Sequence, residues 1–365
     1  MADGESGRPA RPRVDSAIRA PRGTPLFRRS GIATIATLAI VGALLPLLLP
    51  GYMMTSVITT LVFMLLAHAV GAIYTYLRLL MFGVGGFYAI GAYTIMLGVG
   101  GQKWPLWVGM AVAFVLPGLV ALMISPLVFR LRGIHFALVT FSIAELLRSV
   151  LVSWQSLTGG WSGIALDYEG SALWFVSDPR LGTYWVTLTA VILTTAGFLW
   201  FRHSPRGLRA LALGDDLSMA RALGVSPMRF QYGLFIVSGM LCGLAGAITA
   251  LSLRFIDPSI FSATHALAAV TALIIGGWRV VTGPIIGAIA VIFLPELLEV
   301  GPLIAAWIYG GGLILAILLF SEGIGGTLAD RLHARRVGKI RPASNRAASA
   351  ERIASGPSPS SGANR

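Results

Sequence analysis

The sequence predicts an all-α polytopic membrane protein with about ten transmembrane helices, with eight as the alternative count. Hydrophobic residues make up 56% of the 365 residues and charged residues only 12%, whereas an ordinary soluble domain is about 25% charged. The apolar residues form long runs, such as 31–49, 105–129 and 184–201. Each run approaches or exceeds the roughly 18 residues that indicate a bilayer-spanning helix. One membrane domain with two polar tails is therefore expected.

The first element is a basic tail over 1–30, rich in Arg, Pro and Gly, which we expect to be disordered. Arg28-Arg29 resembles the start of a twin-arginine export signal, but the apolar run after it is too long and no small-residue cleavage site follows. A retained first helix is the better interpretation. The Ala-, Ser-, Pro- and Arg-rich residues 326–365 predict a second disordered tail.

The transmembrane domain is expected over 31–325. Its predicted passes are 31–50, 53–75, 82–99, 105–129, 134–154, 183–201, 231–252, 266–278, 283–299 and 303–320. The eighth is too short for a full span, which predicts a broken or re-entrant segment covered by protein or facing a water-filled cavity.

The distribution of charge predicts the orientation. The net charge of +13 lies mostly in the two tails, and an even number of passes places both tails on one side. The positive-inside rule makes that side cytoplasmic. In a soluble protein such basicity would suggest nucleic acid; in a membrane chain it indicates contact with anionic lipid, so no nucleic-acid partner is expected.

The longest cytoplasmic loop, 204–227, carries helix signals. Ser204 can cap a helix with Pro205 at its first position, and we expect that helix to stop at Gly214. Asp215 or Asp216 can then cap a second helix, residues 217–223, that ends at a glycine. Two short helices bent at a glycine are predicted between two passes. Their small, apolar and basic side chains can dock into a groove of another protein or lie on lipid.

No residue pattern predicts chemistry within the chain. A P-loop needs a lysine followed by Ser or Thr, but Trp104 follows Lys103 and Ile340 follows Lys339, and these are the two lysines present. We find no metal-ligand spacing and no nucleophile–base arrangement, and the single cysteine, Cys242, cannot form an internal disulfide. An enzyme is not expected, nor is a bound cofactor or metal. If ATP drives this protein, another subunit must hydrolyse it.

The loop 204–227 resembles the coupling loop of ABC importer permeases in the branched-chain amino acid family. The matching positions are Gly207, Leu208, Arg209, Ala210, Leu211, Asp215, Ala220, Ala222, Leu223 and Gly224. Gly214 stands where that family usually has a charged residue, a departure that weakens a polar contact to the ATPase or sharpens the bend. Residues 85–93, 129–140, 158–164 and 276–284 resemble further motifs of the LivM branch, so the resemblance runs from about 60 to 325.

The resemblance implies an ABC importer permease fold that moves branched-chain amino acids by alternating access in the bacterial cytoplasmic membrane. It also implies two ATPase subunits that use ATP and Mg, a second permease of the LivH type and an extracytoplasmic solute-binding protein. A urea or short-chain amide permease of the same family, or an ion-coupled secondary transporter, remains the alternative. The residues expected to couple to the ATPase are Arg209, Ala210, Leu211, Gly214, Asp215, Asp216, Ala220, Ala222, Leu223 and Gly224.

A second group of residues is a candidate for the substrate pathway. Glu145 and Arg148 are three apart, so they share a helix face and form either a structural ion pair or a substrate contact. Glycines in the spans, including Gly239 and Gly243, favour close helix packing, with a smooth apolar passage as the alternative. The candidate pathway residues are Gly85, Gly86, Tyr88, Glu145, Arg148, Thr158, Gly159 and Gly160.

Overall fold

The computed structural model describes residues 25–48, 51–131, 133–168, 178–222 and 224–293. The predicted pass 303–320 and the tail 326–365 lie outside this part. The α-helices are α1 (Pro25–Leu48), α2 (Met54–Leu77), α3 (Val84–Ile95), α4 (Leu106–Val128), α5 (Ile134–Ser153), α6 (Gln155–Thr158), α7 (Pro179–His203), α8 (Pro205–Asp215), α9 (Leu217–Ala222), α10 (Pro227–Leu253), α11 (Ala263–Gly276) and α12 (Gly283–Ala288). Shorter elements are η2 (Gly51–Met53), η3 (Met96–Gly101), η4 (Gly160–Ser162), η5 (Pro258–Phe261), η6 (Ile289–Phe293) and the strands β1 (Ile164–Ala165) and β2 (Phe255–Ile256).

The all-α polytopic fold is confirmed. Within the described residues, six helices are long and apolar enough to cross a membrane: α2, α3 with η3, α4, α5, α7 and α10. Shorter apolar helices are found over 35–46, 263–276 and 283–293. The helix predicted to be too short is α11, which ends before Gly277, where a φ of 96° reverses the chain toward α12. Helix α1 begins at Pro25, so the last six residues of the predicted tail 1–30 are helical; a proline suits the first helical position.

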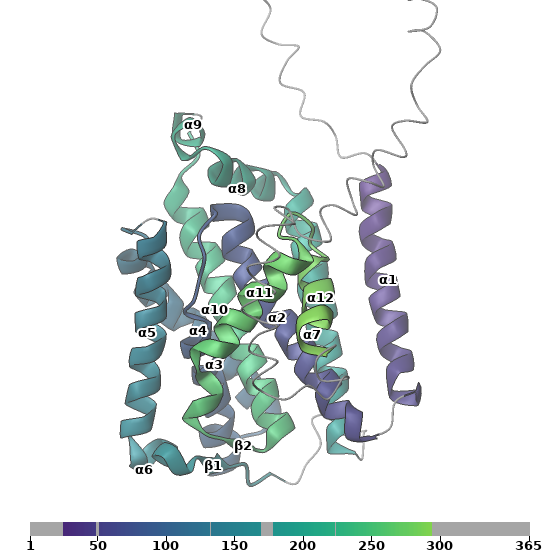
Figure 1. The fold of residues 1–365 in the computed structure, drawn as a ribbon, viewed down its shortest axis with the longest axis vertical. Coiled ribbons are helices and arrows are strands. Elements are labelled where there is room, and N and C mark those ends of the chain that lie inside the picture. Colours follow the sequence, from purple (N-terminus) through teal and green to yellow (C-terminus); the bar gives the residue numbers. More distant parts are fainter. Residues whose placement is uncertain (1–24, 49–50, 132, 169–177, 223, 294–365) are drawn as a thin grey trace, which may run out of the picture.

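Helices α2 and α10 form the centre of the molecule (Figure 1). In α2, 89% of the most apolar stretch is buried, and α10 packs against α2, α3 and α4. Helix α5 lies at the edge, with only 17% of its apolar stretch buried. A helix that is apolar all round is buried either in protein or in lipid, so α2 is a core helix and the outer face of α5 is left for lipid or a partner.

Glycines allow the central helices to approach closely. A Cβ added at Gly91 of α3 would lie 2.0 Å from the carbonyl oxygen of Gly243 in α10, and one added at Gly246 would lie 2.0 Å from the carbonyl oxygen of Tyr88. A Cβ at Gly239 would lie 2.9 Å from the carbonyl oxygen of Pro117 in α4. The close-packing interpretation of Gly239 and Gly243 is therefore confirmed.

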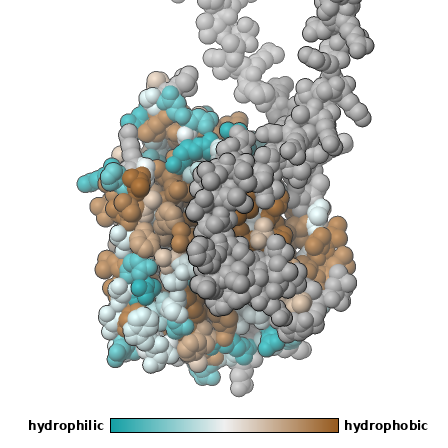
Figure 2. All heavy atoms as spheres, viewed as in Figure 1, coloured by the Kyte–Doolittle hydropathy of each residue, from teal (hydrophilic) through white to brown (hydrophobic). Residues whose placement is uncertain are grey.

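Polar elements gather at the two ends of the helical body. Helices α8 and α9 cover one end, and α6 with the β1–β2 pair covers the other (Figure 1). The two strands pair antiparallel, with Ile164 opposite Ile256; the sequence did not predict them, because each has only two residues. Figure 2 shows hydrophobic residues along the middle of the visible face and hydrophilic ones at the end that holds α8 and α9.

Candidate functional site

The loop 204–227 forms two short capped helices, as predicted. The Ser204 Oγ accepts a hydrogen bond of 3.1 Å from the Gly207 amide, and Pro205 begins α8. The Asp216 carboxylate accepts a hydrogen bond of 2.8 Å from the Ser218 amide at the start of α9. The expected stop at Gly214 was wrong by one residue, because α8 continues to Asp215 and the bend falls on Asp216, whose backbone is extended (φ −148°, ψ 107°).

The inner face of α8 lies against the ends of the neighbouring membrane helices. A Cβ added at Gly214 would lie 2.7 Å from the Tyr76 carbonyl oxygen of α2, and one added at Gly207 would lie 2.0 Å from the Phe201 carbonyl oxygen of α7. Ala210, between the two glycines on this face, is fully buried. Close approach to α2 therefore explains the glycine at 214. Its expected effects on the bend and on a contact to the ATPase stay predictions.

The predicted coupling residues fall on both faces of the helix pair. Ala210 and Ala220 are buried within this chain, while Leu211 and Gly214 are half-buried. The exposed ones are Arg209, Asp215, Asp216, Ala222 and Gly224, and Leu223 lies outside the described residues. The outer face of α8 also presents Leu208, which is 52% exposed, and Ala212. Residues 208 and 212 are one helical turn apart, so they form a stripe that another protein can contact.

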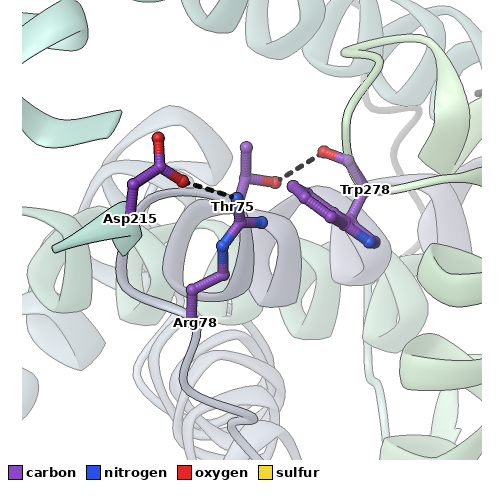
Figure 3. A network of polar contacts seen from close by, with 4 residues as sticks. All are labelled: Thr75, Arg78, Asp215 and Trp278. Atoms are coloured by element: carbon purple, nitrogen blue, oxygen red, sulfur yellow. Dashed lines mark hydrogen bonds and ion pairs between the residues drawn. The ribbon is translucent and has the colours of Figure 1, made fainter. Parts of the chain in front are cut away.

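A polar cluster joins α8 to the membrane helices (Figure 3). Arg78 follows α2 with a left-handed backbone (φ 56°), and its guanidinium donates a 3.1 Å hydrogen bond to the Asp215 carboxylate. The same guanidinium carbon lies 3.6 Å from the centre of the Trp278 ring. The Thr75 hydroxyl donates a 2.9 Å hydrogen bond to the Trp278 carbonyl oxygen. The cluster thus connects α8, the end of α2 and the turn between α11 and α12.

Sequence reasoning missed Arg78, Thr75 and Trp278 as parts of this site. Two signals were present. Trp278 lies in the Gly- and Pro-rich segment 276–284, and Arg78 is a charged residue shortly after an apolar pass. Their contacts join residues 137 and 203 positions apart in the chain, which no local pattern reports.

Two of the candidate pathway residues form an ion pair on α5. The Arg148 Nε donates a 2.8 Å hydrogen bond to the Glu145 carboxylate, and the two side chains are 28% and 30% exposed. The pair lies in the second half of α5, the helix with the smallest buried share among the six long ones described. Charged side chains at the centre of a membrane helix face a protein interior or a water-filled cavity in almost all cases.

The other candidate pathway residues are packed inside the chain. A Cβ added at Gly85 would lie 2.5 Å from the Phe261 carbonyl oxygen, and one added at Gly86 would lie 2.8 Å from Leu147 of α5. The Tyr88 hydroxyl is buried and donates a 2.7 Å hydrogen bond to the Thr249 hydroxyl. These contacts hold α3 against α5, α10 and η5.

Thr158 is the last residue of α6, and Gly159 and Gly160 form the turn between α6 and η4. The Thr158 hydroxyl donates to the Trp154 carbonyl oxygen over 2.9 Å and accepts from the Gly160 amide over 3.2 Å. Gly159 and Gly160 have φ values of 69° and 56°, the left-handed region that glycine adopts without strain. The candidate pathway residues therefore occupy an internal helix contact, a half-buried ion pair and a turn.

One exposed ion pair lies at the end opposite to α8. The Lys103 ammonium donates to the Asp167 carboxylate and lowers the pKa of Asp167 below its ordinary value. The described residues contain no group of three or more His, Cys, Asp or Glu that could hold a metal ion.

Comparison with known proteins gives the family. The model of the family "Branched-chain amino acid transport system / permease component" matches residues 31–321. The chain is 26% identical to the high-affinity branched-chain amino acid transport system permease protein LivM of Escherichia coli over 293 residues, covering 73% of this chain and 68% of LivM. It is 27% identical to the autoinducer 2 import system permease protein LsrC of Enterobacter sp., covering 69% of this chain and 74% of LsrC.

A shorter match covers 36% of this chain and 33% of the xylose transport system permease protein XylH of Escherichia coli, at 28% identity. No solved structure matches the chain with statistical support. The family model spans the described membrane helices and the helix pair over 204–227 together. The chain therefore belongs to the branched-chain amino acid transport permease family and is a LivM-type, multi-pass membrane permease component of ABC-type transport.

Proposed function

We propose that this chain translocates branched-chain amino acids by alternating access, driven by two separate ATPase subunits that dock on α8 and α9. The observation that carries this proposal is the helix pair itself. Its inner face packs closely against the ends of α2 and α7. Leu208 and Ala212 are exposed on its outer face and are not part of the hydrophobic core. A helix pair of this kind transmits force only when something presses on its exposed face.

The polar cluster provides the path for that force. Movement of α8 displaces Asp215, which holds the Arg78 guanidinium, and Arg78 in turn lies against Trp278. The end of α2 and the turn between α11 and α12 therefore move together with the docking helices. Packed elements of this type switch between discrete arrangements more readily than they deform.

The substrate path is proposed along the outer face of α5, where a second permease of the LivH type completes it. Lipid alone would leave the Glu145–Arg148 pair partly exposed to hydrocarbon near the helix centre, at a cost of about 2.5–3.5 kcal/mol for an isolated charge. A partner subunit and a hydrated passage between the subunits remove that cost. The substrate would reach this passage from an extracytoplasmic binding protein, with both termini of the chain cytoplasmic in the bacterial inner membrane.

The docking role is tested with Leu208→Asp plus Ala212→Asp, both at exposed positions of α8. We expect the ATPase subunits no longer to co-purify and ATP-driven uptake to fall to background, with thermal stability of the permease unchanged. Arg130→Asp places a new carboxylate at an exposed position after α4 and is the matched control. It should keep both ATPase co-purification and ATP-driven uptake. Normal uptake by the double variant would refute the docking role. Ala210→Asp is unsuitable, because that side chain is buried in this chain.

The substrate is tested in vesicles that contain the complete complex. We expect ATP-dependent uptake of leucine, isoleucine and valine when the binding protein is supplied. Uptake of urea, short-chain amides or xylose in preference to these would overturn the substrate assignment. Uptake that needs an ion gradient and not ATP would overturn the ABC mechanism in favour of a secondary transporter.

A further inference from the structure

A long groove lies between α7 and α10 and extends to α8. Its volume is about 1230 Å³, and its walls are formed mainly by aliphatic and aromatic side chains such as Val186, Leu193 and Leu241. Leu193 is 66% exposed. The groove is larger than the roughly 300–1,000 Å³ of small-molecule pockets, and those pockets enclose their ligands more fully.

The groove ends in a basic rim. Arg206 and Arg209 of α8 and Arg229 of α10 line this end, and all three are exposed. None of the described residues that line the groove is acidic, and the ion pairs among the described residues do not include these arginines. Trp200, which is 73% exposed, lies at the same end. Arginines with an amphipathic aromatic residue are typical of the level at which lipid headgroups begin.

The groove is long enough for a lipid chain. From Arg229 to Leu244 the wall follows 16 residues of α10, whose 15 steps span about 22 Å at 1.5 Å per residue. One leaflet of hydrocarbon is about 15 Å deep, half of the roughly 30 Å core. An acyl chain can therefore extend along the apolar wall while its headgroup stays at the arginines.

Glycines leave room on both walls. A Cβ added at Gly197 of α7 or at Gly233 of α10 would meet no atom within 4 Å. This contrasts with the glycines of the helix core, where an added Cβ would clash with backbone. The space beside Gly197 and Gly233 is thus open to a ligand and is not filled by a neighbouring helix of the described chain.

We propose that this groove binds an anionic phospholipid, with the phosphate held by Arg206, Arg209 and Arg229 and an acyl chain lying between α7 and α10. Arginine presents paired donors to phosphate oxygens, and the apolar walls take the chain. A helix of another subunit would fill the walls but would leave three arginines without an anion. The proposal needs only that the chain lies in a membrane and does not depend on the transported substrate or on the ATPase.

The test uses the full chain, with the subunits that co-purify, in a neutral detergent. Thermal unfolding is followed while dioleoylphosphatidylglycerol or dioleoylphosphatidylcholine is titrated, since a ligand that binds the folded state raises the midpoint temperature. We expect saturable stabilisation by phosphatidylglycerol at concentrations where phosphatidylcholine has little effect. Water-soluble glycerophosphate should not reproduce it, because it lacks the acyl chains.

Charge variants decide whether the effect belongs to the groove. Arg206→Gln with Arg229→Gln should weaken phosphatidylglycerol binding about 30-fold, given the energy of one basic residue near an anionic headgroup. The same two positions changed to lysine should restore most of it. Arg130→Gln, an exposed arginine outside the groove, is the matched control and should bind like the wild type. A control variant that weakens binding as much as the double variant would show diffuse surface attraction and overturn the site.

A variant of the apolar wall tests the chain position separately from charge. Gly233→Phe fills open space and should weaken phosphatidylglycerol binding without unfolding the protein. Equal stabilisation by the two lipids, or by glycerophosphate, would overturn the proposal. So would cross-linking of a cysteine at 233 to another polypeptide in the assembled complex, which would make the groove a subunit contact.

Discussion

Replacing Gly214 with alanine tests how closely α8 approaches α2. The added Cβ would lie 2.7 Å from the Tyr76 carbonyl oxygen and 3.1 Å from its carbon, whereas ordinary contacts begin at 3.4 Å. The clash is with backbone, so no side chain can rotate away. Helix α8 must therefore move back from α2 by about 0.7 Å, the difference between 3.4 and 2.7 Å.

Two opposing energies decide the sign of the effect. Alanine favours a helix over glycine by about 0.8–1.0 kcal/mol, so propensity alone predicts a more stable protein. Overpacking against a rigid neighbour costs about 1–3 kcal/mol. The net expectation is a loss of up to about 2 kcal/mol. Gly197→Ala is the matched control, because its Cβ meets nothing within 4 Å, and it should be neutral or stabilise by up to about 1 kcal/mol.

Thermal unfolding of the purified chain in one detergent compares the two variants. We expect a lower midpoint for Gly214→Ala and an equal or higher one for Gly197→Ala. ATP-driven uptake should fall in Gly214→Ala, since the shift separates Asp215 from Arg78 in the neighbouring polar cluster. A higher midpoint temperature for Gly214→Ala would refute the close approach of α8 to α2. It would mean that no clash with the Tyr76 backbone offsets the higher helix propensity of alanine.

Three further substitutions test single contacts. Ser204→Ala removes the cap of α8 and should cost about 0.5–2 kcal/mol of helix stability, measured by thermal unfolding together with loss of uptake. Tyr88→Phe removes the hydroxyl that donates to Thr249 and should lower the stability of the fold by about 0.5–1.5 kcal/mol. Uptake should be unchanged, because the side chain packs in the core. Lost uptake at normal stability would instead place Tyr88 on the substrate pathway. Asp167→Asn breaks the exposed pair with Lys103, which lowers the pKa of Asp167. Its small stability deficit should be present at neutral pH and disappear as the wild type is acidified below about pH 4, through that lowered pKa; a deficit that persists in acid would contradict the ion-pair explanation.

Local signals in the sequence predicted the helix pair well. The caps at Ser204 and Asp216 depend on residues within three positions of one another, and both are found where expected. The burial of Ala210 and Ala220 could not be predicted in the same way. Small residues occur on both faces of α8, so the periodicity does not distinguish the face against α2 from the face toward a partner.

The contacts that connect the helix pair to the membrane domain were not predictable from the chain. Arg78 meets Asp215 and Trp278 only after the fold brings the end of α2 beside α8 and the α11–α12 turn. The pathway candidates show the same limit. Tyr88 and Glu145 were both candidates for the pathway, but the structure places the first in the core and the second in a half-buried ion pair with Arg148.

The arginines separate three kinds of surface on this permease. Arg78 contacts the Asp215 carboxylate and the Trp278 indole of its own chain, so it connects elements within this subunit. Arg148 is paired with Glu145, and both side chains are half-buried on α5, the least buried of the six long helices described. An ion pair in a membrane helix still needs polar surroundings, and this favours a partner subunit and a hydrated passage. The arginines at the rim of the groove, which include Arg229, have no acidic residue beside them in the groove lining. An anion from outside the described chain is therefore the best candidate to neutralise their charge. In these proposals, force passes through the Arg78 cluster, substrate passes beside α5, and lipid binds between α7 and α10. Substitutions at Gly214, Glu145 and Arg229 test the three proposals separately.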